Sequence, residues 1–447
     1  MRPTPACCRL RLLPLLPAIL LPAPASAQGG ALPTLSEAGL EYLSESGFLQ
    51  VTLSGQLDLE AFHVGRDRWA GLVGGPVTDS VPVDWRTACA DCHADSVTAF
   101  RGESGPVLAH RLRVFADVFL GDNVYSLVEV RSDRGHAPAD GELRVRIEQA
   151  FVRIASADGS EGVQVGRFAS PFGSYPLRHL TPLDPFLRPP LAYDYRTVMS
   201  RSHAPPDAAS LLDWKEWPEL FRGPGAPPIW DVPYQWGTMA FGRVGPLDLR
   251  AALVGGAPSS APEAWTLELE RLEHPSWVLG ARARLSPSLE VGASYDRGPW
   301  LEEIEVGAIG PVGGAPARSR WDHDQELISA DVSYARGPVM ARAEAILDRW
   351  DVPNVAERLE ERLYSAEVQW DVGPGWSVAL RGGLIDFRPL GDGTGARADW
   401  DYDVHRVEAS LGWRPFRNGG ILLSGYHQDA ADARPTLLVG VRTWWSF

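Results

Sequence analysis

Cysteine is scarce in this chain, which has only four among its 447 residues. Cys7 and Cys8 lie near the start, and Cys89 and Cys92 are the other two. After residue 27 there is no run of ~18 or more consecutive apolar residues, which excludes a membrane-spanning helix. Basic residues are not in excess either, since the net charge is -15, so a nucleic-acid partner is excluded. If the chain crosses a membrane, it must do so as a closed β-barrel.

The first 27 residues have the composition of a secretory signal peptide. Arg9 and Arg11 form a short basic region, an apolar segment follows over 12–21, and Ala25-Ser26-Ala27 has the small-x-small form of a cleavage site. Cleavage before Gln28 removes three arginines and no acidic residue, so the mature net charge is -18. The mature chain is therefore exported to an oxidising compartment, where thioethers and disulfides are stable.

The last residues alternate between apolar and mixed positions up to the final one. One face of this segment consists of Leu437, Val439, Val441, Thr443, Trp445 and Phe447. An alternation of this kind predicts a β-strand. A strand that ends in a terminal Phe resembles the last strand of outer-membrane proteins, where it is the signal read by the barrel-assembly machinery. The resemblance implies a bacterial outer-membrane location, with outer-membrane lipid and that machinery as partners.

Period-2 segments recur upstream, with arginine and aspartate on the face opposite the apolar one, which favours an apolar exterior and a wet lumen. We predict an all-β fold, a 16-stranded antiparallel transmembrane β-barrel over 48–447 with long extracellular loops. The predicted strand starts are near 48, 106, 123, 143, 163, 234, 246, 275, 288, 323, 338, 358, 375, 401, 419 and 435. The segment Trp265–Leu272 also alternates; we place it in an outer loop, and counting it would favour 18 strands.

Short turns are expected on the periplasmic side and long loops outside. The long outer loops are predicted at 66–105, 132–142, 169–233, 298–322 and 388–400. Residues 28–47 form an N-terminal periplasmic segment, in which 34–46 has the pattern of a short helix.

The third and longest outer loop, 169–233, is a candidate for narrowing the pore. Gly166-Arg167-Phe168 followed by Ser170-Pro171-Phe172-Gly173 resembles the segment that leads into this loop in anion- and phosphate-type porins, which implies a loop folded into the lumen. The loop carries Asp184, Asp194, Asp207, Asp213 and Glu216. The pore-lining candidates on the facing wall are Arg111, Arg113, Arg144 and Arg146. Opposed acids and bases would create a transverse field that orients polar solutes; a solvated loop with ordinary lumen charges is the alternative.

Cys89-Ala90-Asp91-Cys92-His93 has the form of a c-type haem attachment site. Cys89 and Cys92 would form thioethers to one covalent haem c, and His93 would be the proximal iron ligand. Two alternatives stay open: a Cys89–Cys92 disulfide, and a zinc or other metal site. The distal iron ligand is not fixed by the sequence. Its candidates are Met199, His203, His110 and His63.

A barrel together with C-x-x-C-H is similar to the fused cytochrome–porin family of iron-oxidising bacteria. The matching residues are Cys89, Cys92 and His93, with the barrel signature through Phe447. The resemblance implies electron transfer at or across the outer membrane, with a periplasmic or surface cytochrome as partner. The alternative function is a passive porin for small polar solutes, with a disulfide and no haem. Hydrolase or transferase chemistry has no motif here, since neither a nucleophile–base arrangement nor a phosphate-cradling glycine loop is present.

Overall fold

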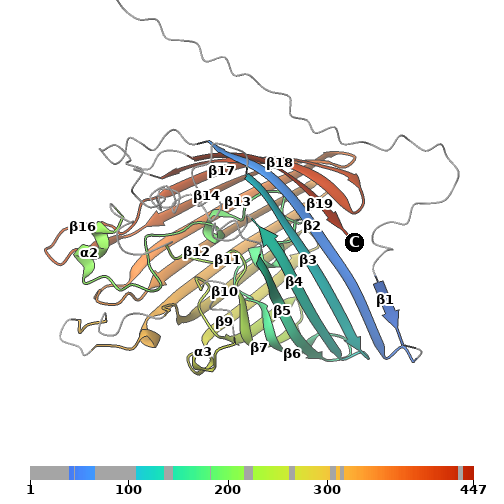
Figure 1. The fold of residues 1–447 in the computed structure, drawn as a ribbon, viewed down its shortest axis with the longest axis horizontal. Coiled ribbons are helices and arrows are strands. Elements are labelled where there is room, and N and C mark those ends of the chain that lie inside the picture. Colours follow the sequence, from blue (N-terminus) through green and yellow to red (C-terminus); the bar gives the residue numbers. More distant parts are fainter. Residues whose placement is uncertain are drawn as a thin grey trace, which may run out of the picture. The chain divides into compact units, whose positions relative to one another are not determined.

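Sixteen antiparallel strands form a closed barrel in the computed structural model of the chain (Figure 1). The structure describes residues 40–44, 46–65, 107–134, 144–181, 183–215, 225–260, 267–302, 309–312, 317–430 and 436–447. The wall strands are β2 (Leu49–Gly65), β3 (Val107–Leu120), β4 (Val124–Arg134), β5 (Arg144–Ala155), β6 (Glu161–Ala169), β7 (Tyr234–Val244), β8 (Leu247–Val254), β9 (Ser276–Ser286), β10 (Leu289–Pro299), β11 (Asp324–Arg336), β12 (Val339–Trp350), β13 (Leu359–Gly373), β14 (Trp376–Phe387), β17 (Val404–Phe416), β18 (Gly419–Ala430) and β19 (Thr436–Ser446). Each predicted strand start lies within three residues of the observed one, so the 16-stranded prediction is confirmed.

The remaining elements are not part of the wall. They are the strands β1 (Leu40–Leu43), β15 (Pro389–Gly391) and β16 (Arg397–Asp399), the helices α2 (Ala208–Asp213) and α3 (Leu269–Glu273), and the short 3-10 turns η3 (Tyr175–Leu177), η4 (Leu191–Tyr193) and η7 (Arg320–Asp322). The predicted short helix over 34–46 is wrong for the residues described, because Leu40–Leu43 form the strand β1. The backbone of β1 pairs with β2, with Leu40 opposite Leu53. Since Leu269–Glu273 is helical, the 18-stranded alternative is wrong.

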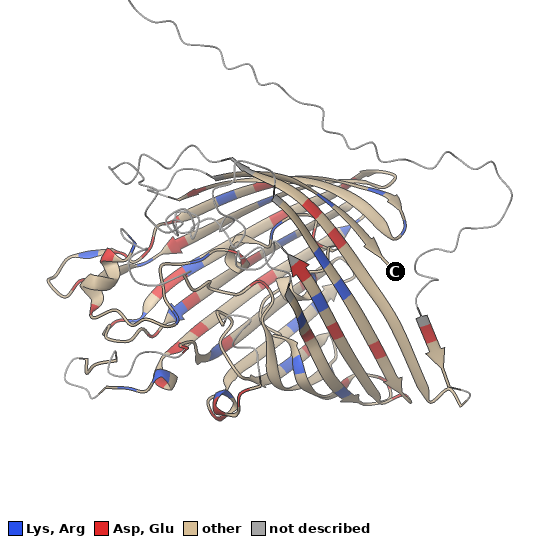
Figure 2. Ribbon diagram, viewed as in Figure 1, with Lys and Arg blue, Asp and Glu red and all other residues tan. Residues whose placement is uncertain are grey.

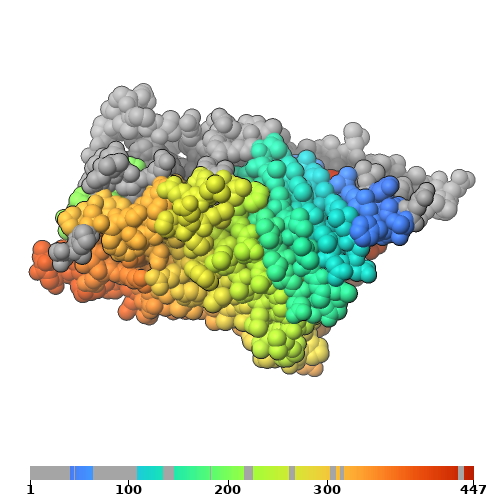
Figure 3. Space-filling view, turned by 90° about the horizontal axis from the view of Figure 1, so that it is seen from below, coloured from blue at the N-terminus to red at the C-terminus, as the bar shows by residue number. Residues whose placement is uncertain are grey.

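Consecutive strands are joined by tight turns at one end of the barrel and by long connections at the other. Gly121 and Gly337 have φ angles of +58° and +59°, a backbone conformation that glycine adopts without a steric penalty. These short hairpins place neighbouring segments of the sequence side by side in the wall. The space-filling view in Figure 3 accordingly shows the colours in chain order across the face that is seen.

The barrel closes where the first and last wall strands meet. β19 pairs with β2 from Leu437 opposite Gly65 to Ser446 opposite Gln56. The terminal Phe447 continues this seam, since its amide donates to the Gly55 carbonyl at 2.9 Å and its carbonyl accepts from the Gly55 amide at 2.8 Å. A Cβ on Gly55 would lie only 2.3 Å from Phe447 Cζ. Gly55 therefore lets the terminal ring cover the seam.

Deletion of Phe447 should lower the amount of assembled barrel several-fold while export of the chain continues. The deletion removes two backbone hydrogen bonds and the ring that covers the seam, whereas the predicted export signal is at the other end of the chain. Heat-modifiable migration of outer-membrane fractions on a gel measures the assembled form. Phe416→Ala is the control, because Phe416 is 67% exposed at the same end of the barrel but away from the seam. Equal assembly of both variants would contradict the prediction.

The wall is apolar outside and polar inside. Leu108, Val145 and Leu380 point outward and are 74%, 66% and 52% exposed. Inward positions on the wall carry charged side chains such as Arg113 and Glu129, which are buried; in Figure 2 blue and red positions alternate with tan ones along neighbouring strands. A water-soluble barrel has the reverse arrangement, so this exterior is suited to lipid.

Aromatic side chains lie at the short-turn end, as in the girdles of membrane barrels. Trp376 and Trp413 stack on the outer face with ring centroids 5.5 Å apart, and Phe416, which follows Trp413 at the end of β17, is also exposed. Within the described ranges, no helix is long and apolar enough to cross a membrane.

Candidate functional site

The connection between β6 and β7, described over 170–181, 183–215 and 225–233, has segments inside the barrel that contact opposite walls; we call this connection the lumen loop. The amide of Gly173 donates to Ser294 Oγ on β10 at 2.9 Å. Thr181 Oγ1 donates to Asp58 Oδ2 on β2 at 2.8 Å. β2 and β10 are eight strands apart in either direction around the barrel, so these contacts face each other across the lumen. The loop therefore spans the lumen from wall to wall.

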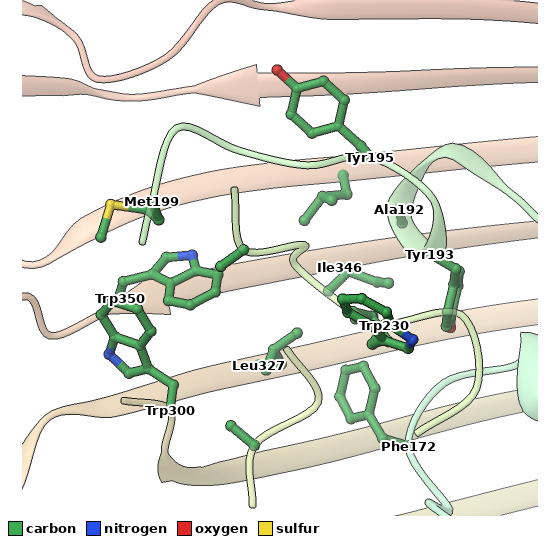
Figure 4. Close-up of a cluster of buried hydrophobic side chains, with 14 of the residues drawn as sticks. Phe172, Ala192, Tyr193, Tyr195, Met199, Trp230, Trp300, Leu327, Ile346 and Trp350 are labelled. Atoms are coloured by element: carbon green, nitrogen blue, oxygen red, sulfur yellow. The ribbon is translucent and has the colours of Figure 1, made fainter. Parts of the chain in front are cut away.

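The hydrophobic core of the molecule lies between the lumen loop and the wall. Met199 and Trp230 from the loop are in one cluster with Leu327, Ile346 and Trp350 from the strands (Figure 4). Trp350 contacts Trp300 edge-on, with ring centroids 4.9 Å apart. Apolar packing of this kind inside a membrane barrel holds the loop in place by burying it, as in a soluble core.

Buried arginines on the wall hold the loop by its backbone carbonyls. Arg442 on β19 donates to the carbonyls of Phe186 at 3.1 Å and Leu187 at 2.7 Å. Arg381 on β14 donates to the carbonyl of Arg188, and Arg406 on β17 donates to the carbonyl of Pro189 at 3.4 Å. Because a guanidinium has five donors, each of these arginines also pairs with a carboxylate. The partners are Glu60 for Arg442, Glu408 for Arg381 and Asp194 for Arg406.

Replacing Arg442 with Met should destabilise the folded barrel by about 3 kcal/mol, because it leaves Glu60 buried without its cation and frees two loop carbonyls. Glu60 is 5% exposed. Denaturant unfolding of the purified barrel in detergent measures the change. Arg243→Met is the matched control, since its ion pair with Asp248 is exposed and is expected to contribute at most ~1 kcal/mol. Equal losses for the two variants would show that Arg442 does not anchor the loop.

A second group of arginines lines β3, β4 and β5. Its members Arg111, Arg113, Arg131 and Arg146 face inward and are interleaved with Glu129, Asp133 and Glu148. The tightest pairs are Arg146 Nε to Glu148 Oε1 at 2.6 Å and Arg131 Nε to Asp133 Oδ2 at 2.7 Å. Arg111 has the longest ion pair of the group, with its Nε 4.0 Å from Asp133 Oδ2. The side chain of Arg144 lies outside the described part of the chain.

A small polar cavity of about 50 Å³ lies between this wall and the lumen loop. The charged residues around it are Arg111, Arg131, Arg146, Arg188, Arg196, Arg442, Asp184, Asp194 and Asp231. Six arginines against three aspartates make the lining positive, although the whole chain is acidic. Its size suits a few water molecules or a small ion, and a positive lining in a low-dielectric enclosure attracts anions.

The loop acids predicted to narrow the pore divide into two sets. Asp184 and Asp194 are buried against the wall arginines, with Asp184 Oδ1 at 3.7 Å from Arg381 and Asp194 Oδ2 at 2.8 Å from Arg406. Asp207 instead caps α2, and the backbone hydrogen bond from Ser210 lowers the pKa of its carboxyl. Asp213 lies exposed at the end of α2. Glu216 lies outside the described residues.

The predicted haem-attachment residues Cys89, Cys92 and His93 lie in the connection between β2 and β3, outside the described residues. Among the residues that the structure describes, no three His, Cys, Asp or Glu side chains come together as ligands for a metal ion.

The four candidates for a distal iron ligand differ in accessibility. Met199 is 0% exposed within the core, so an iron could reach its sulfur only if the lumen loop moved. His203 is exposed, with Nδ1 3.0 Å from Ser202 Oγ. His63 and His110 have outward parity on β2 and β3, and they are not opposite each other, because His110 pairs with Leu59. The structure does not bring these four side chains together.

Sequence reasoning did not single out the arginines that hold the loop. Arg381, Arg406 and Arg442 each occupy an inward position in the alternation of their strand. The alternation could therefore have identified them as lumen residues, but not as partners of loop carbonyls.

No protein-family model and no curated protein sequence matches this chain. Solved structures do match its fold. An anion-selective porin from Comamonas acidovorans is 12% identical, with a TM-score of 0.53 over 89% of this chain and 100% of that one. OmpT of Vibrio cholerae is 11% identical, with a TM-score of 0.50 over 89% of this chain and 98% of that one. The outer-membrane channel DcaP of Acinetobacter baumannii is 11% identical over 91% of this chain, with a TM-score of 0.49.

The fold, the apolar exterior and the aromatic residues at the turn end define the class of this protein. It is a porin-like β-barrel of the bacterial outer membrane. The likeness at these identities concerns the architecture, so the function rests on the residues of this chain.

Proposed function

We propose that this protein is a porin-like barrel that carries one covalent c-type haem on its first outer loop and takes part in electron transfer at or across the outer membrane. The observation that carries this proposal is Cys89-Ala90-Asp91-Cys92-His93, which contains the only cysteines after residue 27. One haem does not bridge a hydrocarbon layer of ~25–30 Å, so a periplasmic or surface cytochrome is the expected partner.

The lumen loop, which crosses the barrel, supports a role other than bulk diffusion. Residues on opposite walls hold the lumen loop, and the cavity beside the arginine wall has a volume of only about 50 Å³. A porphyrin does not fit in that space. If the loop stays in place, the haem lies toward the barrel mouth, where His203 is the accessible candidate on the lumen loop for the distal position.

Expression with a cytochrome c maturation system tests the proposal. The purified barrel should show a Soret band and retain haem after denaturing electrophoresis, because thioethers survive denaturation. Absence of both signals in a heat-modifiable, folded barrel would overturn the haem proposal. A count of free thiols in that material would then separate a Cys89–Cys92 disulfide from two reduced cysteines.

A second candidate function is the slow passage of small anions, which the positive cavity favours. Arg111 is its most informative residue, since among the described residues its ion-pair partner Asp133 is 4.0 Å away and its Nε has no hydrogen-bond partner. One structural neighbour is described as an anion-selective porin. The same lining would act on a small anion through charge-assisted hydrogen bonds.

Reversal potentials in a salt gradient test this second function. The wild-type barrel should prefer chloride over potassium, and Arg111→Gln should reduce that preference. Arg349→Gln is the control, because Arg349 pairs with Glu360 on the outer face of the wall. Cation preference in the wild type, or an equal effect of both variants, would exclude the arginine wall as a selectivity element.

A further inference from the structure

Three buried carboxyl groups lie in one row at the long-loop end of the barrel; we call them the carboxyl row. Asp296 on β10 is opposite Leu327, which is opposite Asp348 on β12, and Asp348 is opposite Glu361 on β13. All three acids are 0% exposed. Asp348 and Glu361 are close enough to share a hydrogen bond.

Among the residues that the structure describes, no arginine, lysine or histidine forms an ion pair with the carboxyl row. Within the same residues, neither oxygen of Asp296 has a hydrogen-bond partner, and one oxygen each of Asp348 and Glu361 also has none. The charged neighbours that act on the row are themselves acidic, namely Asp348 on Asp296, and Asp348 and Asp401 on Glu361. The uncharged neighbours on β9 and β11 are Ser276 and Gln325.

Cationic side chains on the elements packed around the row are engaged elsewhere. Arg201 pairs with Glu302, Arg196 stacks on Trp230, and His323 contacts Asp351. Three ionised carboxylates cannot be held together in an enclosure of this kind without compensation, because burial and like charge both disfavour the charged form.

The row is connected to the lumen loop through hydrogen bonds. Gln325 Nε2 donates at 2.8 Å both to Asp348 Oδ2 and to the carbonyl of Pro228 in the loop. On the other side, Trp350 Nε1 donates to Glu361 Oε1 at 3.1 Å, and the Trp350 ring lies close to Met199 of the loop (Figure 4). A change of charge in the row therefore acts on both the Pro228 and the Met199 parts of the loop.

The row lies beyond the apolar band of the wall. On the long-loop side of the row, the next residues that point outward from these strands and from β11 are charged: Arg297, Glu326, Arg349 and Glu360. Water and protons therefore have access to this end of the barrel.

We propose that the carboxyl row is a proton-operated lock on the lumen loop. With protons on the row, the carboxyl groups share hydrogen bonds and the Gln325 bridge to Pro228 holds. As the pH rises, a proton passes from the row to water and two neighbouring carboxylates repel each other in a buried site. An amide donor binds a carboxylate more strongly than a carboxylic acid, so Gln325 follows the separating Asp348 side chain and its bond to the Pro228 carbonyl breaks. The loop then loosens and the conductance of the barrel increases. The lock concerns the channel alone and is independent of the haem.

Conductance of the full-length barrel in planar bilayers, from about pH 6 to about pH 10, tests the lock. Wild-type conductance should rise on the order of threefold over that range, and it should reverse on return to neutral pH. Asp348→Asn with Glu361→Gln should keep the conductance low throughout, because the amides preserve hydrogen bonding but do not ionise. Asp331→Asn is the matched control, since Asp331 is an inward acid paired with Arg282; it should behave as wild type.

Three results would overturn the proposal: a wild-type conductance independent of pH, a rise that persists in the double amide variant, or a rise that Asp331→Asn abolishes equally. Heat-modifiable migration confirms that each variant is folded before it is measured. If the double variant does not assemble, Asp296→Asn takes its place and should weaken the rise, because it removes one ionisable group from the row; an unaltered rise would count against the lock.

Discussion

Cys89→Ala combined with Cys92→Ala should abolish covalent haem completely while the barrel still assembles. Thioethers need both thiols, and no other cysteine follows residue 27. Assembly should be unaffected, because β2 ends at Gly65 and β3 begins at Val107, and both cysteines fall in the sequence between these two wall strands. Haem staining after denaturing electrophoresis measures attachment, and heat-modifiable migration measures folding.

His93→Ala is the matched variant of the same motif. It should keep the covalent haem and shift the Soret band, since in the proposed site Cys89 and Cys92 form the bonds to the porphyrin and His93 coordinates the iron. Haem staining that persists after denaturing electrophoresis of the double cysteine variant would contradict this attachment site. A His93→Ala spectrum identical to wild type would remove His93 from the iron.

Removal of residues 179–193 from the lumen loop, with a short Gly-Ser bridge, should raise the conductance on the order of tenfold. This segment contains the carbonyls held by Arg381 and Arg442 and the contact of Thr181 with Asp58. A sixteen-stranded wall without such a loop encloses an aqueous channel. Single-channel recording in planar bilayers measures the change.

A deletion at the rim is the control for this experiment. Removing 206–215 takes out α2, which packs near β15 at the long-loop end, and leaves the segment that crosses the lumen in place. It should change the conductance little. Equal increases for both deletions would mean that general loosening, rather than the crossing segment, sets the conductance.

The wall of this barrel follows directly from the sequence. Period-2 alternation places Arg111 and Arg113 inside and Leu108 and Leu112 outside, and the pairing of β2 with β3 keeps that assignment. Tight turns such as that at Gly121 fix where each strand ends. A strand has only two faces, so a pattern of period 2 determines which side chains face lipid and which face the lumen. An antiparallel sheet with an apolar exterior has to close in a membrane, because an open edge would leave backbone N–H and C=O groups in lipid without hydrogen-bond partners.

The contents of the lumen were decided only by tertiary structure. Alternation identifies Arg442 as an inward residue but does not say that it binds the carbonyl of Leu187, more than 250 positions earlier. The carboxyl row likewise joins Asp296, Asp348 and Glu361 from three strands through their register. The path of the lumen loop depends on which walls it meets, because its segments follow no period and are held by long-range hydrogen bonds and apolar contacts. The sequence thus determined the wall of the barrel and its two faces. The closure of the barrel brought distant strands together and so determined which charged side chains are paired.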